Sequence, residues 1–405
     1  MAINRFISIN DLDLGDKRVL LRVDFNVPIK DGSVVDDSRI QASITTIREL
    51  LEARAKLMLM SHLGRPEEGI HDKQYSLAPV ACCLSNLLQN NVPLITDWQD
   101  GVELAPGELV LLENVRFEKG EKTNDDDLAR QMAAICDVYV NDAFATAHRA
   151  QASTHGVAKY APVACAGPLL IGEVEALSKA LEDPAKPLLA VVGGAKVSTK
   201  LTVLESLLPV IDQLILGGGI ANTFLLAAGY NIGHSLHEPD LVPVARDLMA
   251  TASQQGKDIP LPVDVVCAMQ FSEDAEAISK TIDDVKQDDL IMDIGPKTAR
   301  LYAELIDKAA TIVWNGPLGV FEFEQFSQGT KALVNAIAKS DAFSLAGGGD
   351  TLSAINSFGV SDDISYISTG GGAFLEFIEG KQLPVISMLE ESARAWYTME
   401  RAREY

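Results

Sequence analysis

The sequence has few of the features that mark disulfide-rich, membrane or nucleic-acid-binding proteins. Its five cysteines include no CxxC pair, and their odd number and scattered spacing argue against a disulfide framework or a zinc site. No apolar run reaches membrane length, and the first ten residues lack the apolar core of a signal peptide. Basic residues are outnumbered 34 to 57 by acidic ones, a formal net charge of −23. We therefore expect no nucleic acid or membrane partner, and a monomer in the cytoplasm.

The chain nevertheless has enough aliphatic material for two or three domains. It has 405 residues, of which 47% are apolar and only 6% aromatic, as expected of aliphatic cores. The arginines are unevenly distributed, since ten of the fifteen precede residue 170. Because the guanidinium fork suits carboxylates and phosphates, the first half is where we expect a small anionic ligand. The alternative explanation is that the arginines are unevenly distributed by chance and are simply solvated at the surface.

Short apolar runs alternate with helix-length segments along the whole chain. The runs are continuously apolar, as expected of strands buried on both faces, and the alternation predicts an α/β fold with two doubly wound parallel-sheet domains. A helical pattern after Gly167-Pro168, stopped by Pro184 and Pro187, predicts a helix between the domains. The predicted strands are 19–23, 55–60, 92–95, 109–112, 136–140, 188–192, 213–217, 290–294, 311–315 and 342–346. The predicted helices are 38–54, 76–89, 124–135, 198–208, 297–309 and 328–339.

Glycine clusters in the second half each follow a strand-like run and precede a helical one. Such a turn exposes backbone N–H groups at a helix N-terminus and can hold an anion, and together they should share the carboxyl edge of one sheet. A single cluster is as readily explained by tight packing. Segment 193–200 is not a P-loop, and segment 217–224 lacks the third glycine of a dinucleotide-binding turn. The clusters are Gly193-Gly194, Gly217-Gly218-Gly219, Gly347-Gly348-Gly349 and Gly370-Gly371-Gly372.

Charged residues accompany these glycine clusters. Lys196 and Lys200 lie near a predicted helix start, where lysines oppose the helix dipole, so they indicate a bound phosphate or are simply solvated. Asp350 follows three glycines and is either a helix N-cap or a ligand of Mg²⁺. Asn315 opens a turn that leads to Glu322, which is either a ribose contact or an exposed loop acid.

Polar and cationic residues follow the predicted strands of the first half. In a parallel sheet such strand ends meet at one edge. We interpret the group as a pocket for a phosphate and a carboxylate. Taken singly, each arginine could be a surface residue and His62 a capped loop histidine. The residues are Asp24, Asn26, Arg39, His62, Arg65, Arg116, His148 and Arg149.

Taken together, in their order and spacing, these segments resemble the phosphoglycerate kinase family over essentially the whole chain. The motifs are RVDFNVP (22–28), SHLGRP (61–66), ENVRF (113–117), NDAFATAHR (141–149), GGAKVSTKL (193–201), GGGIANTF (217–224), WNGPLGVFE (314–322), GGGDT (347–351) and STGGGAFLE (368–376). The resemblance implies two α/β domains facing each other across a cleft. Residues 1–170, with the tail from about 388 to 405, would bind 3-phosphoglycerate or 1,3-bisphosphoglycerate. Residues 171–387 would bind ADP or ATP with Mg²⁺.

The resemblance also assigns residues and an activity: reversible transfer of the acyl phosphoryl group of 1,3-bisphosphoglycerate to ADP, in glycolysis and gluconeogenesis, with domain closure. Segment 295–302 is a less typical version of the loop beside the adenine. A non-catalytic nucleotide-binding scaffold and a kinase for another carboxylate remain as alternatives. The expected triose contacts are Asp24, Phe25, Asn26, Arg39, His62, Leu63, Gly64, Arg65, Arg116 and Arg149. The expected nucleotide contacts are Lys200, Gly217, Gly218, Asn315, Glu322, Gly348, Gly349, Thr351 and, for the metal, Asp350. The residues expected beside the transferred group are Arg39, Lys196, Lys200 and Gly371.

Overall fold

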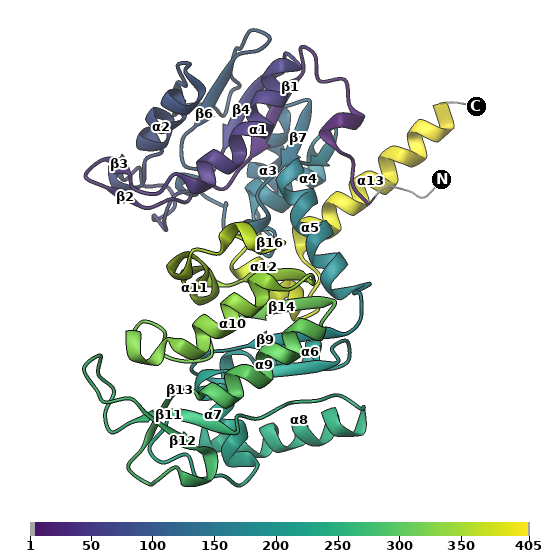
Figure 1. Ribbon diagram of the computed structural model, residues 1–405. Coiled ribbons are helices and arrows are strands. Elements are labelled where there is room, and N and C mark those ends of the chain that lie inside the picture. The colour runs from purple at the N-terminus through teal and green to yellow at the C-terminus, as the bar shows by residue number, and fades with distance from the viewer. Residues whose placement is uncertain (1–4, 404–405) are drawn as a thin grey trace. The chain divides into compact units, whose positions relative to one another are not determined.

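The computed structural model describes residues 5–403, which form an α/β fold with two parallel sheets (Figure 1). The chain divides into two compact units, Met1–Val174 with Gln382–Tyr405, and Glu175–Lys381. It passes from the first unit to the second within helix α5 (Pro168–Leu181). The predicted fold class, including the helix between the two halves, is confirmed. Among residues 5–403, none of the helices has both the length and the apolar character needed to span a bilayer.

The first unit is built on a parallel sheet whose central strand is β1. Leu20 of β1 lies opposite Met58 of one neighbouring strand and Tyr139 of the other. The middle residues of the core strands are continuously apolar, as in Val19–Leu21 of β1 and 57–60 of β4, because helices cover both faces of the sheet. In the described residues the strand order is β5 (Leu94–Ile95), β6 (Leu109–Leu112), β4 (Lys56–Met60), β1 (Arg18–Arg22), β7 (Val138–Asn141) and β8 (Ala164–Ala166).

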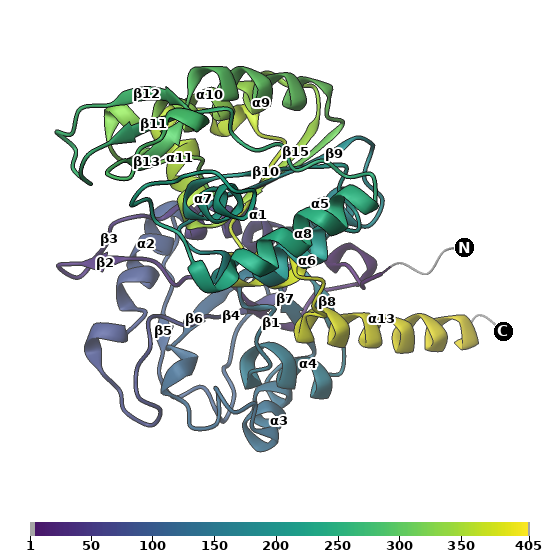
Figure 2. The ribbon, with the colours of Figure 1, turned by 90° about the horizontal axis from the view of Figure 1, so that it is seen from below.

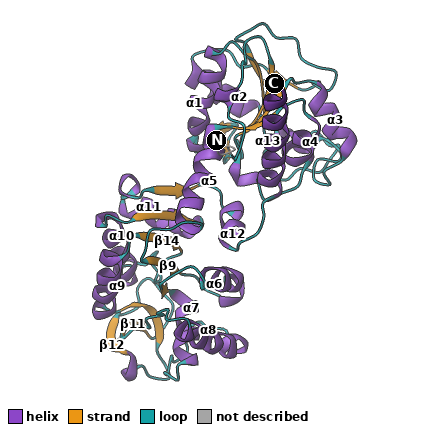
Figure 3. Ribbon diagram, turned by 90° about the vertical axis from the view of Figure 1, so that its right-hand side faces the viewer, coloured by secondary structure: helices purple, strands orange, loops and turns teal. Residues whose placement is uncertain are grey.

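Two groups of helices flank this sheet (Figure 3). Helices α1 (Ser38–Glu52) and α2 (Ala78–Leu88) lie on one face, and α1 turns Ile40, Ile47 and Leu50 into the core at helical spacing. The other face carries α3 (Asp126–Ala134), α4 (Val157–Tyr160) and the C-terminal α13 (Pro384–Arg403). Figure 2 shows α13 beside α4 and β8, where Ser392 Oγ donates to Ala164 O at 2.9 Å. A short antiparallel hairpin, β2 (Ile29–Lys30) and β3 (Ser33–Val34), precedes α1.

The second unit repeats the plan with a second parallel sheet. Helices α9 (Pro296–Lys308), α10 (Gln328–Lys339) and α11 (Gly349–Phe358) lie on one face, and α6 (Leu201–Leu207) and α7 (Gly218–Ala227) on the other (Figure 3). Helix α8 (Val242–Gln254) packs against α7. In the described residues the strand order is β10 (Gln213–Leu216), β9 (Leu188–Val192), β14 (Thr311–Asn315), β15 (Phe343–Gly347) and β16 (Tyr366–Ser368). The helices that follow these strands are α6 (Leu201–Leu207), α7 (Gly218–Ala227), α10 (Gln328–Lys339), α11 (Gly349–Phe358) and α12 (Gly372–Ile378).

One predicted strand belongs to a different sheet. The run 290–294 forms β13 (Leu290–Ile294), but it pairs antiparallel with β11 (Asp264–Ala268), which also pairs antiparallel with β12 (Ile278–Thr281). The prediction of a parallel strand is therefore wrong here. A continuous apolar run shows that a strand is buried, but it carries no information about its direction. From β13 the chain continues through α9 (Pro296–Lys308) to β14.

Candidate active site

The polar residues predicted in the first half gather at the carboxyl edge of its sheet. Asp24 follows β1, His62 follows β4 and Arg116 lies in the 3₁₀ turn Val115–Phe117 after β6. Arg149 lies in the loop after β7. These strands are neighbours in the order β6, β4, β1, β7 and run parallel, so their carboxyl ends share one edge. The sheet topology itself brings the four residues to one side of the unit.

Arg39, from the first turn of α1, is held at this edge by an ion pair. Its Nη1 donates to Asp24 Oδ2 at 2.6 Å and to Asn26 O at 3.3 Å. Asn26 in turn accepts the Gly64 N–H on its side-chain oxygen at 2.9 Å, which links the loops after β1 and β4. Phe25, between them, is fully buried. The carboxylate of Asp24 thus orients the Arg39 guanidinium, which remains partly exposed.

Arg116 lies deeper in the same edge. Its Nη1 donates to Gly64 O, while its Nε is buried and has no hydrogen-bond partner in the described part of the chain. Burial, reinforced by the charges of Arg149 and Arg22, lowers the pKa of Arg116 to about 10. A buried guanidinium with an unused donor is suited to an anionic ligand. The Leu63 backbone beside it is fixed by Asn114, whose Oδ1 accepts the Leu63 N–H at 3.2 Å.

The remaining predicted triose contacts differ in exposure. Arg65 is exposed and makes no hydrogen bond to the other residues between 5 and 403. Arg149 is half-buried, and its Nε donates to His148 Nε2 at 3.0 Å. His62 is only 3% exposed, so its ring is buried at this edge of the sheet. Burial, and after it the charges of four arginines, lowers the pKa of His62 well below its ordinary value.

In the second unit the glycine turns do share one sheet edge, as the sequence predicts. They follow β9, β10, β15 and β16, which belong to one parallel sheet. The backbones approach so closely that a Cβ on Gly193 would lie 1.9 Å from Pro317 O, and one on Gly219 would lie 2.1 Å from Ala195 O. Glycine at these positions therefore serves close backbone approach.

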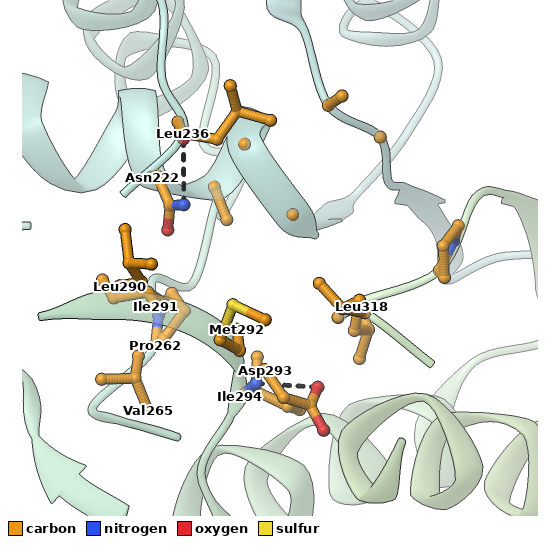
Figure 4. Close-up of a pocket in the computed structure, with 18 of the residues that line it drawn as sticks. Asn222, Leu236, Pro262, Val265, Leu290, Ile291, Met292, Asp293, Ile294 and Leu318 are labelled. Carbon is orange, nitrogen blue, oxygen red and sulfur yellow. Dashed lines mark hydrogen bonds between the residues drawn. The ribbon is translucent and has the colours of Figure 1, made fainter. Parts of the chain in front are cut away.

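Beside these turns lies a cavity of about 540 Å³ (Figure 4). Its walls are mainly aliphatic and include Val265, Leu290, Ile291, Met292 and Leu318. Such a cavity, apolar with a few polar groups at its edge, is typical of a small-molecule site. Of the predicted nucleotide contacts, Gly218, Glu322 and Asp350 line it.

Three other predicted nucleotide contacts, Lys200, Asn315 and Thr351, lie in a hydrogen-bonded cluster at the sheet edge, while Gly217, Gly348 and Gly349 belong to the glycine turns. Lys200 is the residue before α6, and its Nζ donates to Asn315 Oδ1. Asn315 Nδ2 donates to Gly347 O at 2.6 Å, and the buried Thr351 Oγ1 accepts the Gly316 N–H at 2.8 Å. Burial lowers the pKa of the Lys200 amine, while the charges of nearby acidic residues oppose the shift. A partly desolvated lysine of this kind gains from an anionic ligand.

The structure excludes one of the two alternatives for Asp350 and refines the position of Lys196. The residue that caps α11 is Gly348, with φ 98°, and no side chain makes a capping bond, so the alternative of Asp350 as the N-cap does not hold, while its role toward Mg²⁺ stays a prediction. Asp350 lies exposed in the first turn, beside Gly349. Lys196 is exposed and precedes a 3₁₀ turn, Val197–Thr199, which leads into α6. Gly371 precedes α12 with φ 50°.

Comparison with known proteins agrees with this geometry. Residues 9–381 match the family model described as phosphoglycerate kinase. The chain belongs to the phosphoglycerate kinase family. The solved phosphoglycerate kinase from Coxiella burnetii is 57% identical, covers 96% of this chain and 100% of its own, and superposes with a TM-score of 0.94. The phosphoglycerate kinase from Pyrococcus horikoshii OT3 is 36% identical, with coverages of 95% and 99% and a TM-score of 0.78.

Membership of the phosphoglycerate kinase family settles the class of activity. The chain is a phosphotransferase with a carboxyl group as acceptor, a kinase of glycolysis, and the resemblance drawn from the sequence is confirmed. The comparisons give no support to the alternative of a non-catalytic scaffold. The family implies phosphoglycerate and ADP or ATP as small-molecule substrates.

Sequence reasoning overlooked Arg22, Glu121 and Ser153, which join the predicted His62 in supporting this phosphoglycerate kinase site. We call Arg22, His62, Glu121 and Ser153 the Arg22 network, because Arg22 contacts both His62 and Ser153, and Ser153 contacts Glu121. All four side chains are buried. One signal was available in the sequence: Arg22 is a charged residue inside an apolar run that was itself predicted to be a buried strand.

Proposed function

We propose that the enzyme binds 3-phosphoglycerate at the arginine-rich edge of its first unit and the Mg²⁺–nucleotide at the glycine-lined cavity of its second. The observation that carries the proposal is the match between each substrate and the chemistry of one edge. A small molecule with a phosphate and a carboxylate needs several charge-assisted donors; Arg116 and Arg149 follow strands of one sheet, and Arg39 reaches the same edge from α1 through Asp24. A nucleotide needs an apolar cavity for its base and N–H groups for its phosphates, which the second unit offers.

At the first edge, a phosphate and a carboxylate would share the guanidinium groups. The exposed Arg65 and half-buried Arg149 would bind the phosphate, together with the unpaired Nε of Arg116. Arg39, oriented by Asp24, would face the carboxylate that accepts the phosphoryl group. The number of arginines favours a substrate with a phosphate besides its carboxylate, and so argues for phosphoglycerate over a plain carboxylic acid.

At the second edge, the nucleotide base would occupy the aliphatic cavity and the phosphates would lie toward Lys200. Glu322, exposed at the cavity wall, would accept ribose hydroxyls. The glycine turns let the nucleotide approach the backbone closely, since no Cβ stands between them. Lys200 would exchange its bond to Asn315 for a phosphate oxygen.

Asp350 fits the role of a magnesium ligand. Its carboxylate lines the cavity, is exposed, and accepts no hydrogen bond from the residues between 5 and 403. Mg²⁺ in nucleotide sites takes one or two protein carboxylates and completes its coordination with phosphate oxygens and water. The bound ion would neutralise developing charge on the nucleotide phosphates. Among the described residues, no group of three or more His, Cys, Asp or Glu side chains could hold a metal ion. We therefore propose that the phosphate oxygens of the bound nucleotide, with water, supply the ligands of Mg²⁺ other than Asp350.

The transfer itself needs positioning and cations more than proton transfer. The attacking group is an ADP phosphate oxygen in one direction and a carboxylate in the other, and both are ionised at neutral pH, so no general base is required. We propose direct in-line transfer, with Arg39 and Lys200 stabilising the migrating group, aided by Lys196 and the N–H groups at Gly371. Because these groups belong to different units, the reaction requires the units to bring their ligands together and exclude water.

A coupled assay with ATP, Mg²⁺ and 3-phosphoglycerate tests the proposal. We expect turnover with 3-phosphoglycerate and little with glycerate, which lacks the phosphate that the arginines would bind. Comparable turnover with glycerate would contradict the triose site. That the enzyme works as a monomer in the cytoplasm also stays a prediction, which gel filtration and cell fractionation test.

A further inference from the structure

Arg22 lies at the centre of the Arg22 network, at the end of β1. Its side chain is fully buried. The Nε donates to Ser153 Oγ at 3.1 Å, Nη1 donates to the backbone oxygen of Val23, and Nη2 lies 3.3 Å from His62 Nδ1. A buried guanidinium is costly unless its donors are satisfied and its charge is offset. The surroundings of Arg22 therefore need an anion and a fixed set of acceptors.

Glu121 supplies the anion, and Ser153 connects it to Arg22. Glu121 Oε1 accepts the Ser153 hydroxyl at 2.6 Å, and Oε2 accepts the Ser153 N–H at 2.9 Å. Because the hydroxyl has a single proton and gives it to Glu121, its oxygen is left to accept the Arg22 Nε–H. The hydrogen bonds thus run in one direction, from Arg22 through Ser153 to Glu121. Burial raises the pKa of Glu121, while its bond to Ser153 and the charge of Arg22 oppose that shift.

The position of Ser153 is itself fixed. It belongs to the π-helical turn Ala152–Gly156, and its carbonyl oxygen accepts the Tyr139 hydroxyl at 3.0 Å. Asn141 Nδ2 donates to the same Tyr139 hydroxyl at 2.8 Å. Since both Tyr139 and Asn141 belong to strand β7, which pairs with β1, the serine that holds Arg22 is anchored to the sheet.

This arrangement decides where the proton of His62 resides. A guanidinium has donors only, so His62 Nδ1 must accept from Arg22, and the neutral ring then carries its proton on Nε2. Asp24 is the competing partner, but its Oδ1 lies 3.9 Å from Nδ1, beyond hydrogen-bond distance, and its Oδ2 is engaged by Arg39 at 2.6 Å. The cations that face the ring are Arg22, Arg39, Arg116 and Arg149. Because four guanidinium groups outweigh the carboxylate of Asp24 around His62, the neutral imidazole is favoured over the charged imidazolium.

We infer that Arg22, held in place by Ser153 and Glu121, is a positioning residue that fixes His62 as the neutral Nε2–H tautomer. His62 then meets a substrate oxygen as a hydrogen-bond donor and not as a further cation. That the donor acts on 3-phosphoglycerate rests on the proposed triose site, whereas the tautomer is a property of the free enzyme. The benefit is a contact whose strength does not change across neutral pH.

The first test locates the proton by NMR. The free enzyme, labelled with ¹⁵N-histidine, contains six imidazoles, and His62 is assigned by comparison with His62→Gln. We expect the two ring nitrogens of His62 to show separate acceptor and N–H shifts, with the proton on Nε2, unchanged from pH 6 to pH 8. A proton on Nδ1, or a ring that is doubly protonated at pH 7, would overturn the inference.

The second test removes the connection between Arg22 and Glu121. Ser153→Ala deletes both the acceptor for Arg22 Nε and the donor to Glu121. We expect the His62 tautomers to mix and the dissociation constant for 3-phosphoglycerate to rise about tenfold, the range of one charge-assisted hydrogen bond. Ser85→Ala is the matched control, because the Ser85 hydroxyl on α2 also makes two hydrogen bonds but belongs to no candidate site. Its tautomer and affinity should equal those of the unaltered enzyme.

A purely structural role for Ser153 predicts a different result. In that case Ser153→Ala would lower the melting temperature, but His62 would still show the single Nε2–H form, and the affinity for 3-phosphoglycerate would equal that of the Ser85→Ala control. That result would overturn the inference. Should Ser153→Ala not fold, Glu121→Gln probes the same connection, with Glu118→Gln as its control, and the spectrum of the unaltered enzyme still decides the tautomer. If 3-phosphoglycerate were found to bind elsewhere, only the proposed triose site would be overturned, because the proton is located in the free enzyme.

Discussion

The two candidate sites occupy the same place in their sheets but are built from different materials. In the first unit, the carboxyl edge carries buried and half-buried charges, with Arg22 and Arg116 almost inaccessible to solvent. In the second, the corresponding edge carries glycine turns and an aliphatic cavity of about 540 Å³, with Lys200 as a half-buried cation. The parallel sheet therefore determines where a ligand site forms, and the residues after each strand determine what it binds.

Under the proposed function, this difference implies two modes of recognition. At the first edge, recognition would depend on charge-assisted hydrogen bonds from the guanidinium groups, so removing a side chain would remove binding energy directly. At the second edge, it would depend on shape and on close backbone approach, and the few charged side chains there would serve the phosphates and the metal. The predictions below separate the two modes.

The largest effect should come from the two cations that we propose to stabilise the migrating phosphoryl group, one from each unit. Arg39→Ala or Lys200→Ala should each lower kcat about 10²–10³-fold while disturbing the separate affinities less, because their charges matter most in the transition state. Arg39→Lys should also be impaired, since an ammonium group cannot reproduce the planar fork. The measurement is kcat at saturating substrates, with each ligand titrated alone.

A double-mutant cycle shows whether Arg39 and Lys200 act as one unit. The double variant should be clearly less impaired than the product of the two single effects. Lys308→Ala, at the exposed end of α9, is the control for loss of a lysine and should retain full kcat. A Lys200→Ala enzyme with normal kcat and only a raised KM would reduce Lys200 to a ground-state contact.

The next effect should be confined to the first unit. Arg65→Ala or Arg149→Ala should weaken 3-phosphoglycerate binding by about 1.5–3 kcal/mol, because each removes a charge-assisted contact to phosphate. Binding of ATP alone should be unchanged, and Arg48→Ala, an exposed arginine on α1, should affect neither ligand. Calorimetric titration of both ligands makes the comparison. An equal loss of ATP affinity would show that the two sites are not chemically separate.

The reverse pattern should hold for Asp350. Asp350→Ala should raise the KM for Mg²⁺–ATP about tenfold, the lower end of what losing a supporting group costs a metal site, and leave 3-phosphoglycerate affinity intact. Asp307→Ala, an exposed acid on α9, is the matched control. If instead the triose affinity falls and the nucleotide affinity survives, the assignment of ligands to units is reversed.

One physical rule made both the α/β fold and the grouping of the candidate site residues predictable from the sequence. The residues that follow parallel strands lie at the carboxyl edge of their sheet. Asp24, His62 and Arg116 therefore lie at the carboxyl edge of the first sheet, and the glycine turns lie at that of the second. Their contact roles stay predictions until ligands are bound.

What the sequence did not reveal depends on contacts between distant segments. The direction of β13 follows from its pairing with β11, which an apolar run does not encode. Glu121 and Ser153 lie in loops far from Arg22 in the sequence, and only the folded chain makes them its partners. Asp350 follows glycines as an N-cap would, but the backbone of Gly348 takes that position.

The smallest effect concerns how each unit stabilises a buried acid. Glu121 in the first unit has Ser153 and the charge of Arg22 beside it. Asp293 lies at the cavity wall in the second unit and, among residues 5–403, its carboxylate accepts only backbone N–H groups, from Ile294 at 2.9 Å (Figure 4) and from Gly329 at 2.6 Å. Burial raises the pKa of Asp293 to about 7. No side-chain cation offsets this shift, so Asp293 should titrate near neutral pH.

The sign of the resulting pH dependence follows from linkage. Because the pKa of Asp293 in the folded state is about 7 and that of an unfolded aspartate is about 3.9, the folded state holds the extra proton between these values. Its contribution to stability is full below about pH 3.9, falls as the pH rises toward the folded-state pKa, and is lost once the pH has passed through 7. Between pH 6 and pH 8 the loss is about 1 kcal/mol, or about 2–4 °C in melting temperature.

Asp293→Asn isolates this contribution, because asparagine does not titrate. We compare the melting temperature of the unaltered protein with that of the variant at each pH. The difference, unaltered minus variant, should fall by about 2–4 °C from pH 6 to pH 8. Any destabilisation caused by the amide beside the Gly329 N–H is the same at both pH values and does not affect this change. Asp307→Asn, on the exposed surface of α9, should show a difference that is constant with pH. A constant difference for Asp293→Asn as well would mean that the two backbone N–H groups alone keep the carboxylate ionised, and that the second unit tolerates a buried acid without a side-chain cation.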